Sequence, residues 1–77
     1  MRKNPSYETF QSTLIRARKQ KKLTQYQLAT LLNRPQSFVC KYEIGERRLD
    51  VIEFIEVCKT LEISPLEIIK EVINIDE

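Results

Sequence analysis

The apolar positions of the chain recur at helical intervals, beginning with a stretch from about Ser6 to Lys22. Phe10, Leu14 and Ala17 share one face of this stretch, and Asn4-Pro5 offers an entry into a helix. The pattern therefore predicts a long first helix. Its last turns, RARKQKK, are basic, which suits both a helix C-terminus and contact with phosphate.

Two shorter helices are predicted next, joined by a tight turn. Thr24 has the side chain of an N-cap for a helix over 25–32, whose inward positions are Leu28, Ala29 and Leu32. Asn33 tolerates the left-handed conformation at a helix end, and Pro35 can open a third helix that runs to about Ile44. Gly45, the only glycine, stands where that helix would end at positive φ.

Two further helices complete the pattern. Asp50 is the N-cap of a fourth helix with an expected buried stripe of Val51, Phe54, Ile55, Cys58 and Leu61. Ser64-Pro65-Leu66-Glu67 fits a capping box with proline at the first helical position, which starts a fifth helix. The fold class expected from these elements is all-α, a compact bundle of five helices.

Length and composition narrow the function classes. Seventy-seven residues suit one domain over 1–77, with a core from about 6 to 73. No apolar run approaches the roughly 18 residues of a membrane span, and the start of the chain lacks a signal-type apolar region, so a cytoplasmic protein is expected. Without histidine, the usual catalytic triads and zinc sites are excluded; we expect no enzyme, no cofactor and no metal.

The small net charge of +2 conceals a strong asymmetry. Residues 1–48 carry eleven basic and three acidic side chains, and residues 49–77 carry two basic and eight acidic ones. One segment therefore has a charge of +8 and the other of −6, from the same counts. A basic surface suits a polyanion, which makes double-stranded DNA the leading partner class. Alternatively, both sets of charges only solvate helix surfaces.

The two short helices have the spacing of a helix-turn-helix, a spacing that generic helical hairpins share. Four short stretches of sequence are more specific than the spacing. They are Leu23-Thr24-Gln25, Leu28-Ala29, Lys41-Tyr42-Glu43-Ile44-Gly45 followed by Glu46-Arg47-Arg48, and Leu61-Glu62-Ile63-Ser64. Over about Leu14 to Ile69 the chain resembles the lambda repressor and Cro-like family, also called the xenobiotic-response-element (XRE) type. Two positions depart from the family, Asn33 in place of glycine and Pro35 in place of a capping serine or threonine.

The resemblance implies that Pro35 to Ile44 is the recognition helix in the major groove. Gln36 can donate to and accept from the edge of adenine, Ser37 can bond to a base or a phosphate, and Lys41 can reach guanine or the backbone. We therefore predict these three as base-reading residues. The residues expected to contact phosphate are Thr24, Gln25, Arg47 and Arg48.

Other residues near the predicted recognition helix have more open interpretations. Phe38 either touches a thymine methyl group or packs against a neighbouring element. Cys40 is expected to be exposed beside the basic surface, as a redox-sensitive or an inert thiol. The resemblance also implies an ion pair between Arg18 and Glu43 that ties the first helix to the end of the recognition helix.

The last helix has an apolar arc wider than one core contact needs, so residues 66–77 are predicted to form a dimerisation helix. Its surplus residues are Ile68, Val72 and Ile75, with Ile52 as a further candidate. The expected assembly is a symmetric homodimer that directs its two basic sides to one duplex. The alternative is a wider core contact with the tail folded back.

The function expected from these features is sequence-specific DNA binding by a transcriptional regulator. The finer expectation is a repressor that binds a palindromic operator as a homodimer. The alternative is an antitoxin or another protein-interaction module, with a protein partner bound through the C-terminal apolar strip.

Overall fold

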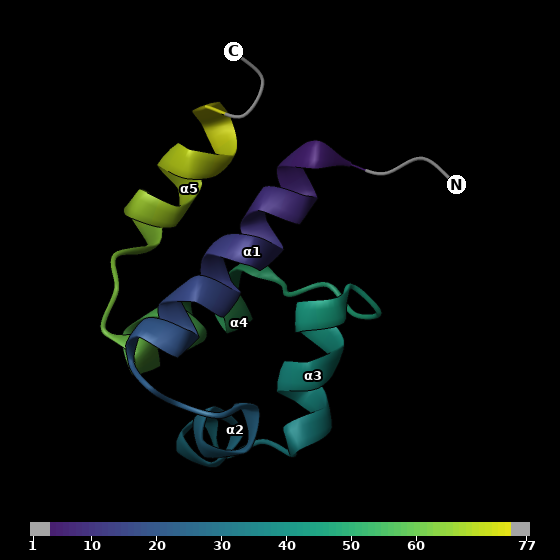
Figure 1. The fold of residues 1–77 in the computed structure, drawn as a ribbon, viewed down its shortest axis with the longest axis vertical. Coiled ribbons are helices and arrows are strands. Elements are labelled where there is room, and N and C mark those ends of the chain that lie inside the picture. The colour runs from purple at the N-terminus through teal and green to yellow at the C-terminus, as the bar shows by residue number, and fades with distance from the viewer. Residues whose placement is uncertain (1–3, 75–77) are drawn as a thin grey trace.

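Residues 4–74, the part of the chain that the computed structural model describes, form five helices around one apolar core (Figure 1). The helices are α1 (Pro5–Gln20), α2 (Gln25–Leu32), α3 (Gln36–Ile44), α4 (Val51–Leu61) and α5 (Pro65–Asn74). Within this range there is no strand, which confirms the predicted all-α fold. None of these helices has the length and apolarity needed to cross a membrane.

The core draws one face from every helix. Its largest fully buried side chains are Leu14, Leu28, Val39, Tyr42, Val57, Cys58 and Leu61. The expected burial of Val51 is wrong, because Val51 is the first residue of α4 and is 70% exposed. Val57 takes its place in the stripe, since it lies three residues after Phe54 and four before Leu61.

The helix boundaries agree with the predicted ones to within two residues. Asn33 and Gly45 end α2 and α3 with φ of 59° and 88°. Helix α1 ends at Gln20 rather than Lys22, because Lys22 itself has a φ of 60°. Pro35 is the N-cap of α3 and not its first residue. Glu62 at φ 59° ends α4 in the same left-handed way as Lys22 ends α1, although neither residue type signals it.

Side-chain caps hold the starts of four helices, and at the first of them Asn4 Oδ1 accepts from the Tyr7 N–H at the start of α1. Thr24 Oγ1 accepts from the Gln27 N–H while Gln27 Oε1 accepts from the Thr24 N–H, so α2 begins with a complete capping box. A second box, between Asp50 and Glu53, begins α4. Ser64 Oγ accepts from the Leu66 N–H at 3.2 Å at the start of α5.

Helix α5 runs back alongside α1 (Figure 1), and this packing corrects the predicted apolar strip. Ile68 is buried, with 4% of its surface exposed, so the expectation that a monomer leaves Ile68 in water is wrong. Val72 is half-buried, and Ile75 lies outside the described residues. The apolar side chains that α5 does expose are Leu66, Ile69 and Ile73. Because Ile68 is used against the body of the protein, the free apolar face is rotated to the other side of the helix.

Candidate nucleic-acid interface

Helices α2 and α3 form the two arms of a helix-turn-helix, joined by residues 33–35. The Asn33 N–H donates to the carbonyl of Thr30, and the Arg34 N–H donates to the carbonyl of Ala29 at 2.9 Å. Ala29 is buried and small, which allows α3 to approach α2 closely. The turn is therefore held by backbone hydrogen bonds and by the left-handed conformation of Asn33.

The three predicted base-reading residues lie together on the solvent side of α3. Gln36, Ser37 and Lys41 are all exposed, whereas Val39 and Tyr42 face the core. Within the described residues, Lys41 has no ion-pair partner, so its ammonium group is available to a ligand. This edge of α3 offers an amide, a hydroxyl and an ammonium, the groups that read base edges or bind phosphate.

Phe38 packs inside the protein. The residue is 7% exposed, and its ring meets the ring of Tyr42 edge to face, with 5.6 Å between centroids. The guanidinium carbons of Arg34 and Arg47 lie 4.6 and 4.9 Å from the Phe38 centroid. The structure therefore supports the interpretation in which Phe38 packs against neighbouring elements.

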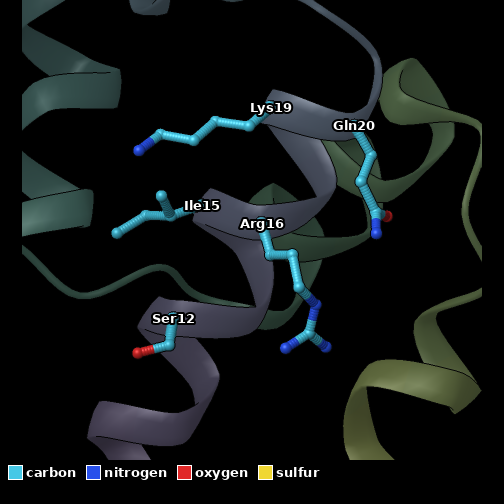
Figure 2. A pocket seen from close by; sticks show the side chains of 5 residues that line it. All are labelled: Ser12, Ile15, Arg16, Lys19 and Gln20. Carbon is cyan, nitrogen blue, oxygen red and sulfur yellow. The ribbon is translucent and has the colours of Figure 1, made fainter.

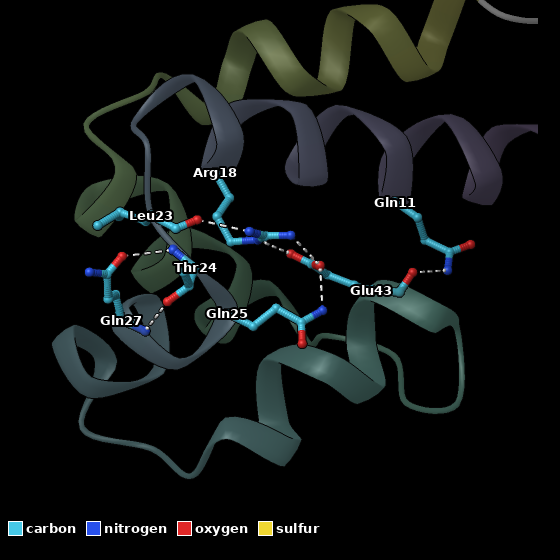
Figure 3. Close-up of polar contacts among 7 residues, drawn as sticks. All are labelled: Gln11, Arg18, Leu23, Thr24, Gln25, Gln27 and Glu43. Atoms are coloured by element: carbon cyan, nitrogen blue, oxygen red, sulfur yellow. Dashed lines mark hydrogen bonds and ion pairs between the residues drawn. The ribbon is translucent and has the colours of Figure 1, made fainter.

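A buried polar network joins α1, the start of α2 and the end of α3 (Figure 3). Arg18 Nε donates to Glu43 Oε2 at 2.8 Å and Arg18 Nη2 to Glu43 Oε1 at 3.0 Å. Arg18 Nη1 donates to the carbonyl of Leu23, and Gln25 Nε2 donates to Glu43 Oε1 at 2.9 Å. The hydrogen bond to Glu43 raises the pKa of Arg18 above the ordinary value of an arginine. One carboxylate thus fixes the relative placement of three helices.

The backbone at the C-terminal end of α3 has a hydrogen bond of its own to α1. Gln11 Nε2 donates to the carbonyl of Glu43 at 3.0 Å, which satisfies an otherwise unpaired carbonyl at the end of α3 (Figure 3). A side chain at Gly45 would meet Gln11, because an added Cβ would lie 3.0 Å from Gln11 Nε2. Gly45 is therefore needed for its φ of 88°, and a side chain there would also have to displace the Gln11 amide.

The four predicted phosphate-binding residues have different surroundings. Thr24 is exposed but its hydroxyl caps α2, and the amide nitrogen of Gln25 is engaged by Glu43. Arg47 donates through both terminal nitrogens to Glu53, at 2.9 and 2.7 Å. Arg48 is exposed, with its guanidinium 4.4 Å from the ring centroid of Tyr7. Arg48 is thus the least engaged of the four, and Gln25 and Arg47 also have internal roles.

Folding interleaves the basic and acidic segments more than their order along the chain suggests. Acidic side chains of α4, of α5 and of the loop between them form ion pairs with four basic residues, as Arg16–Glu71, Lys21–Glu62, Arg47–Glu53 and Arg34 with both Glu53 and Glu56. The expected separation into a basic and an acidic side is therefore only partial. The charge asymmetry of the sequence overstated the free positive charge beside α3.

The Glu53 carboxylate titrates far below its usual range. The hydrogen bonds from Arg47, and then from the Asp50 N–H, lower the pKa of Glu53 from 4.5 to about 2. Because the folded-state pKa is depressed, the ionised Glu53 stabilises the fold fully above pH 4.5 and loses that effect as pH falls toward 2. We expect urea unfolding to show Glu53→Gln less stable than the wild type at pH 7, with the difference shrinking over this window. A constant difference from pH 7 to pH 2 would contradict the assignment.

Elsewhere, an open hollow of about 430 Å³ lies on α1, lined by Ser12, Ile15, Arg16, Lys19 and Gln20 (Figure 2). None of the residues predicted to contact DNA lines it. Arg16, on the side of α5, is bound to Glu71 by two hydrogen bonds of 2.8 and 2.9 Å. The exposed edge of α3, and not this hollow, is therefore the candidate interface.

The two cysteines differ in their surroundings. Cys58 is fully buried, and burial raises the pKa of its thiol to about 11, which makes it an unreactive core residue. Cys40 is half-buried on α3, less exposed than expected. Neither cysteine is in a disulfide.

Sequence reasoning missed two parts of this site. Arg34 and Glu53 contribute to the environment of α3, yet neither was a candidate site residue. The Asp50-x-x-Glu53 spacing is a capping-box signal that could have placed Glu53 at the start of α4. No local signal connects Glu53 to Arg34 or Arg47, because that contact depends on how α4 packs.

Comparisons with known proteins agree with this geometry. The family model described as "Helix-turn-helix" matches residues 14–68. A solved structure of an XRE-family like protein from Pseudomonas syringae pv. tomato str. DC3000 is similar, with 42% sequence identity and a TM-score of 0.82 over 87% of this chain and 82% of that one.

A second solved structure, the clp gene regulator ClgR from C. glutamicum, is 20% identical, with a TM-score of 0.80 over 92% of each chain. At that identity it supports the fold alone. Comparison with curated proteins gave no match. Because the family match spans most of the chain and includes both α2 and α3, the protein belongs to the XRE, or lambda repressor-like, family of DNA-binding helix-turn-helix regulators.

Proposed function

We propose that this protein is a transcriptional repressor that binds a palindromic operator as a homodimer. The observation that carries the sequence-specific part is the exposed edge of α3, where Gln36, Ser37 and Lys41 lie outside the core on a helix that α1 and α2 hold by hydrogen bonds. A preorganised helix with free donors and acceptors is what direct readout in the major groove requires. Arg48 and the start of α2 lie at the flanks as contacts to phosphate. No catalytic or cofactor role is part of this proposal.

A second copy of the chain is the proposed occupant of the free face of α5. Leu66, Ile69 and Ile73 are spaced three and four residues apart, so they form one row, and they are 67%, 41% and 63% exposed. Lys70 and Glu67 lie beside the row and carry opposite charges. A two-fold axis that pairs this helix with itself in antiparallel orientation can place lysine opposite glutamate. This row replaces Ile68 as the centre of the proposed interface, and the half-buried Val72 remains at its edge.

Selection of bound duplexes from a random pool tests the proposed function. A symmetric motif with half-sites about 10 to 10.5 base pairs apart, or a multiple of this, is expected from a two-fold dimer. Recovery of unselective sequences, or of a single unpaired half-site, would contradict it.

The base-reading role of Gln36 gives a sharper expectation. Gln36→Ala should weaken binding to the selected duplex by about 1–3 kcal/mol, a loss of about 5- to 150-fold, and should relax the preference at one base position. Fluorescence anisotropy on duplexes with each base at that position measures both effects. Gln20→Ala is the matched control, since Gln20 is an exposed glutamine on α1. Equal losses in the two variants would remove Gln36 from the interface.

The exposed α5 row also supports the alternative, a module that binds a different protein. Salt dependence distinguishes the two. DNA binding through six or more phosphate contacts loses about a thousandfold in affinity between 50 and 200 mM salt, whereas an apolar protein contact changes little. Protein binding without any selected duplex motif would favour the alternative.

A further inference from the structure

Two arginines beside the recognition helix share one carboxylate. Glu53 Oε2 lies 2.7 Å from Arg47 Nη2 and 3.5 Å from Arg34 Nη1. The same two guanidiniums cover the ring of Phe38, at 4.6 and 4.9 Å from its centroid. We call this set of four side chains, Arg34, Phe38, Arg47 and Glu53, the arginine clamp.

The arginine clamp borders the predicted base-reading edge. Arg34, Phe38 and Arg47 line a hollow of about 270 Å³ together with Ser37, Lys41 and Pro35. A DNA strand that brings bases to Ser37 and Lys41 would therefore bring its backbone near the two guanidiniums.

Glu53 already occupies the donors that a phosphate would use. Both terminal nitrogens of Arg47 donate to Glu53, and Nη1 also donates to the carbonyl of Arg48 at 3.1 Å. Glu53 is well covered, with 12% of its side chain exposed, and its backbone N–H is fixed by Asp50. The carboxylate is thus rigidly presented and resembles a bound anion in charge and in bidentate geometry.

We propose that Glu53 is a specificity-determining residue of the DNA interface, because its carboxylate competes with DNA phosphate for Arg34 and Arg47. Nonspecific DNA, which offers little besides phosphate, must displace Glu53 to reach these arginines. A correct operator also gains base contacts on α3, so its binding depends less on the two arginines. The inference rests on the proposed DNA-binding function and adds that Glu53 lowers the affinity for nonspecific DNA.

Glu53→Gln tests the competition. The amide oxygen of glutamine can still accept from the Asp50 N–H in the capping box, while the negative charge is removed. For a nonspecific duplex, the slope of log affinity against log salt should steepen by about 0.9 for each arginine released. Each released arginine should also make the affinity ratio between 50 and 200 mM salt about 3.5-fold larger. The ratio of operator to nonspecific affinity should fall.

Two controls separate competition from other causes. Glu56→Gln makes the same change of charge on α4, but the Glu56 side chain is 54% exposed, and among residues 4–74 its one ion pair is with Arg34, at 3.6 Å. Equal effects of Glu56→Gln and Glu53→Gln would overturn the proposal in favour of net charge. In the background of Arg47→Gln, Glu53→Gln should give a smaller gain in nonspecific affinity, and an undiminished gain would also overturn it.

Folding and DNA binding are checked in the same series. Circular dichroism at the temperature of the binding assay establishes that each variant is folded. A proportional loss of operator and nonspecific affinity in folded Glu53→Gln would mean that Glu53 positions the arginines for phosphate, which contradicts competition. A wild-type protein that binds no duplex would instead refute the proposed function itself.

Discussion

Replacing Glu43 with alanine is expected to lower the free energy of unfolding by about 3–5 kcal/mol, because the substitution leaves Arg18 charged and buried without its partner. Only 10% of the Arg18 side chain and 3% of the Glu43 side chain are exposed, so water cannot replace the lost interaction. A domain of this length has a total stability of about 4–12 kcal/mol. Glu43→Ala should therefore bring the protein close to unfolding at 37 °C.

The measurement is urea unfolding followed by circular dichroism near 15 °C. Glu46→Ala is the control, since Glu46 is an exposed glutamate three residues further on. Replacing both partners with apolar residues, Arg18→Met and Glu43→Leu, should recover much of the loss, because no buried charge remains unpaired. A loss below about 0.5 kcal/mol in Glu43→Ala would show that the network is not buried in solution.

The same substitution should weaken operator binding in conditions where the protein is still folded. Glu43 holds the end of α3 to α1 through Arg18 and to the start of α2 through Gln25. Without that anchor, α3 can shift relative to α2, and base contacts on its exposed edge depend on small displacements. Operator affinity equal to that of the wild type in folded Glu43→Ala would contradict this positioning role.

Replacing Ile69 and Ile73 with glutamine is expected to convert the proposed dimer to a monomer and to weaken operator binding by about 100-fold or more. The two recognition helices of a dimer bind their half-sites together, so loss of the dimer removes the high effective concentration of the second one. Glutamine is chosen because it adds no charge that would repel DNA. Both residues are exposed, so the monomer itself should keep its fold.

Sedimentation equilibrium and duplex binding test this expectation in parallel. Leu31→Gln is the matched control, because Leu31 is 60% exposed but lies on α2, outside the row. Ile68→Gln should behave differently from the α5 double variant and lower stability, since Ile68 is buried. A wild-type protein that sediments as a monomer at 100-fold above its operator dissociation constant would refute the dimer.

Local signals in the sequence were sufficient for the elements of the helix-turn-helix. Thr24, Asn33 and Gly45 mark the ends of α2 and α3 because their side chains, or the lack of one, set the energy of a single backbone position. Apolar spacing likewise predicted which face of α2 is inward. It failed at Lys22, where a left-handed residue carries no compositional mark.

The sequence by itself determined the fold class, the order of the helices and the polar edge of α3, because caps and helical periodicity act over a few residues. Only the tertiary structure decided which apolar side of α5 stays free and which basic residues are already paired. Ile68 is buried because α5 packs on α1, and Arg47 is engaged because α4 brings Glu53 to it. Both results depend on contacts between segments that are distant in the chain. The net charge or the number of apolar residues in one segment does not say which other segment it will contact.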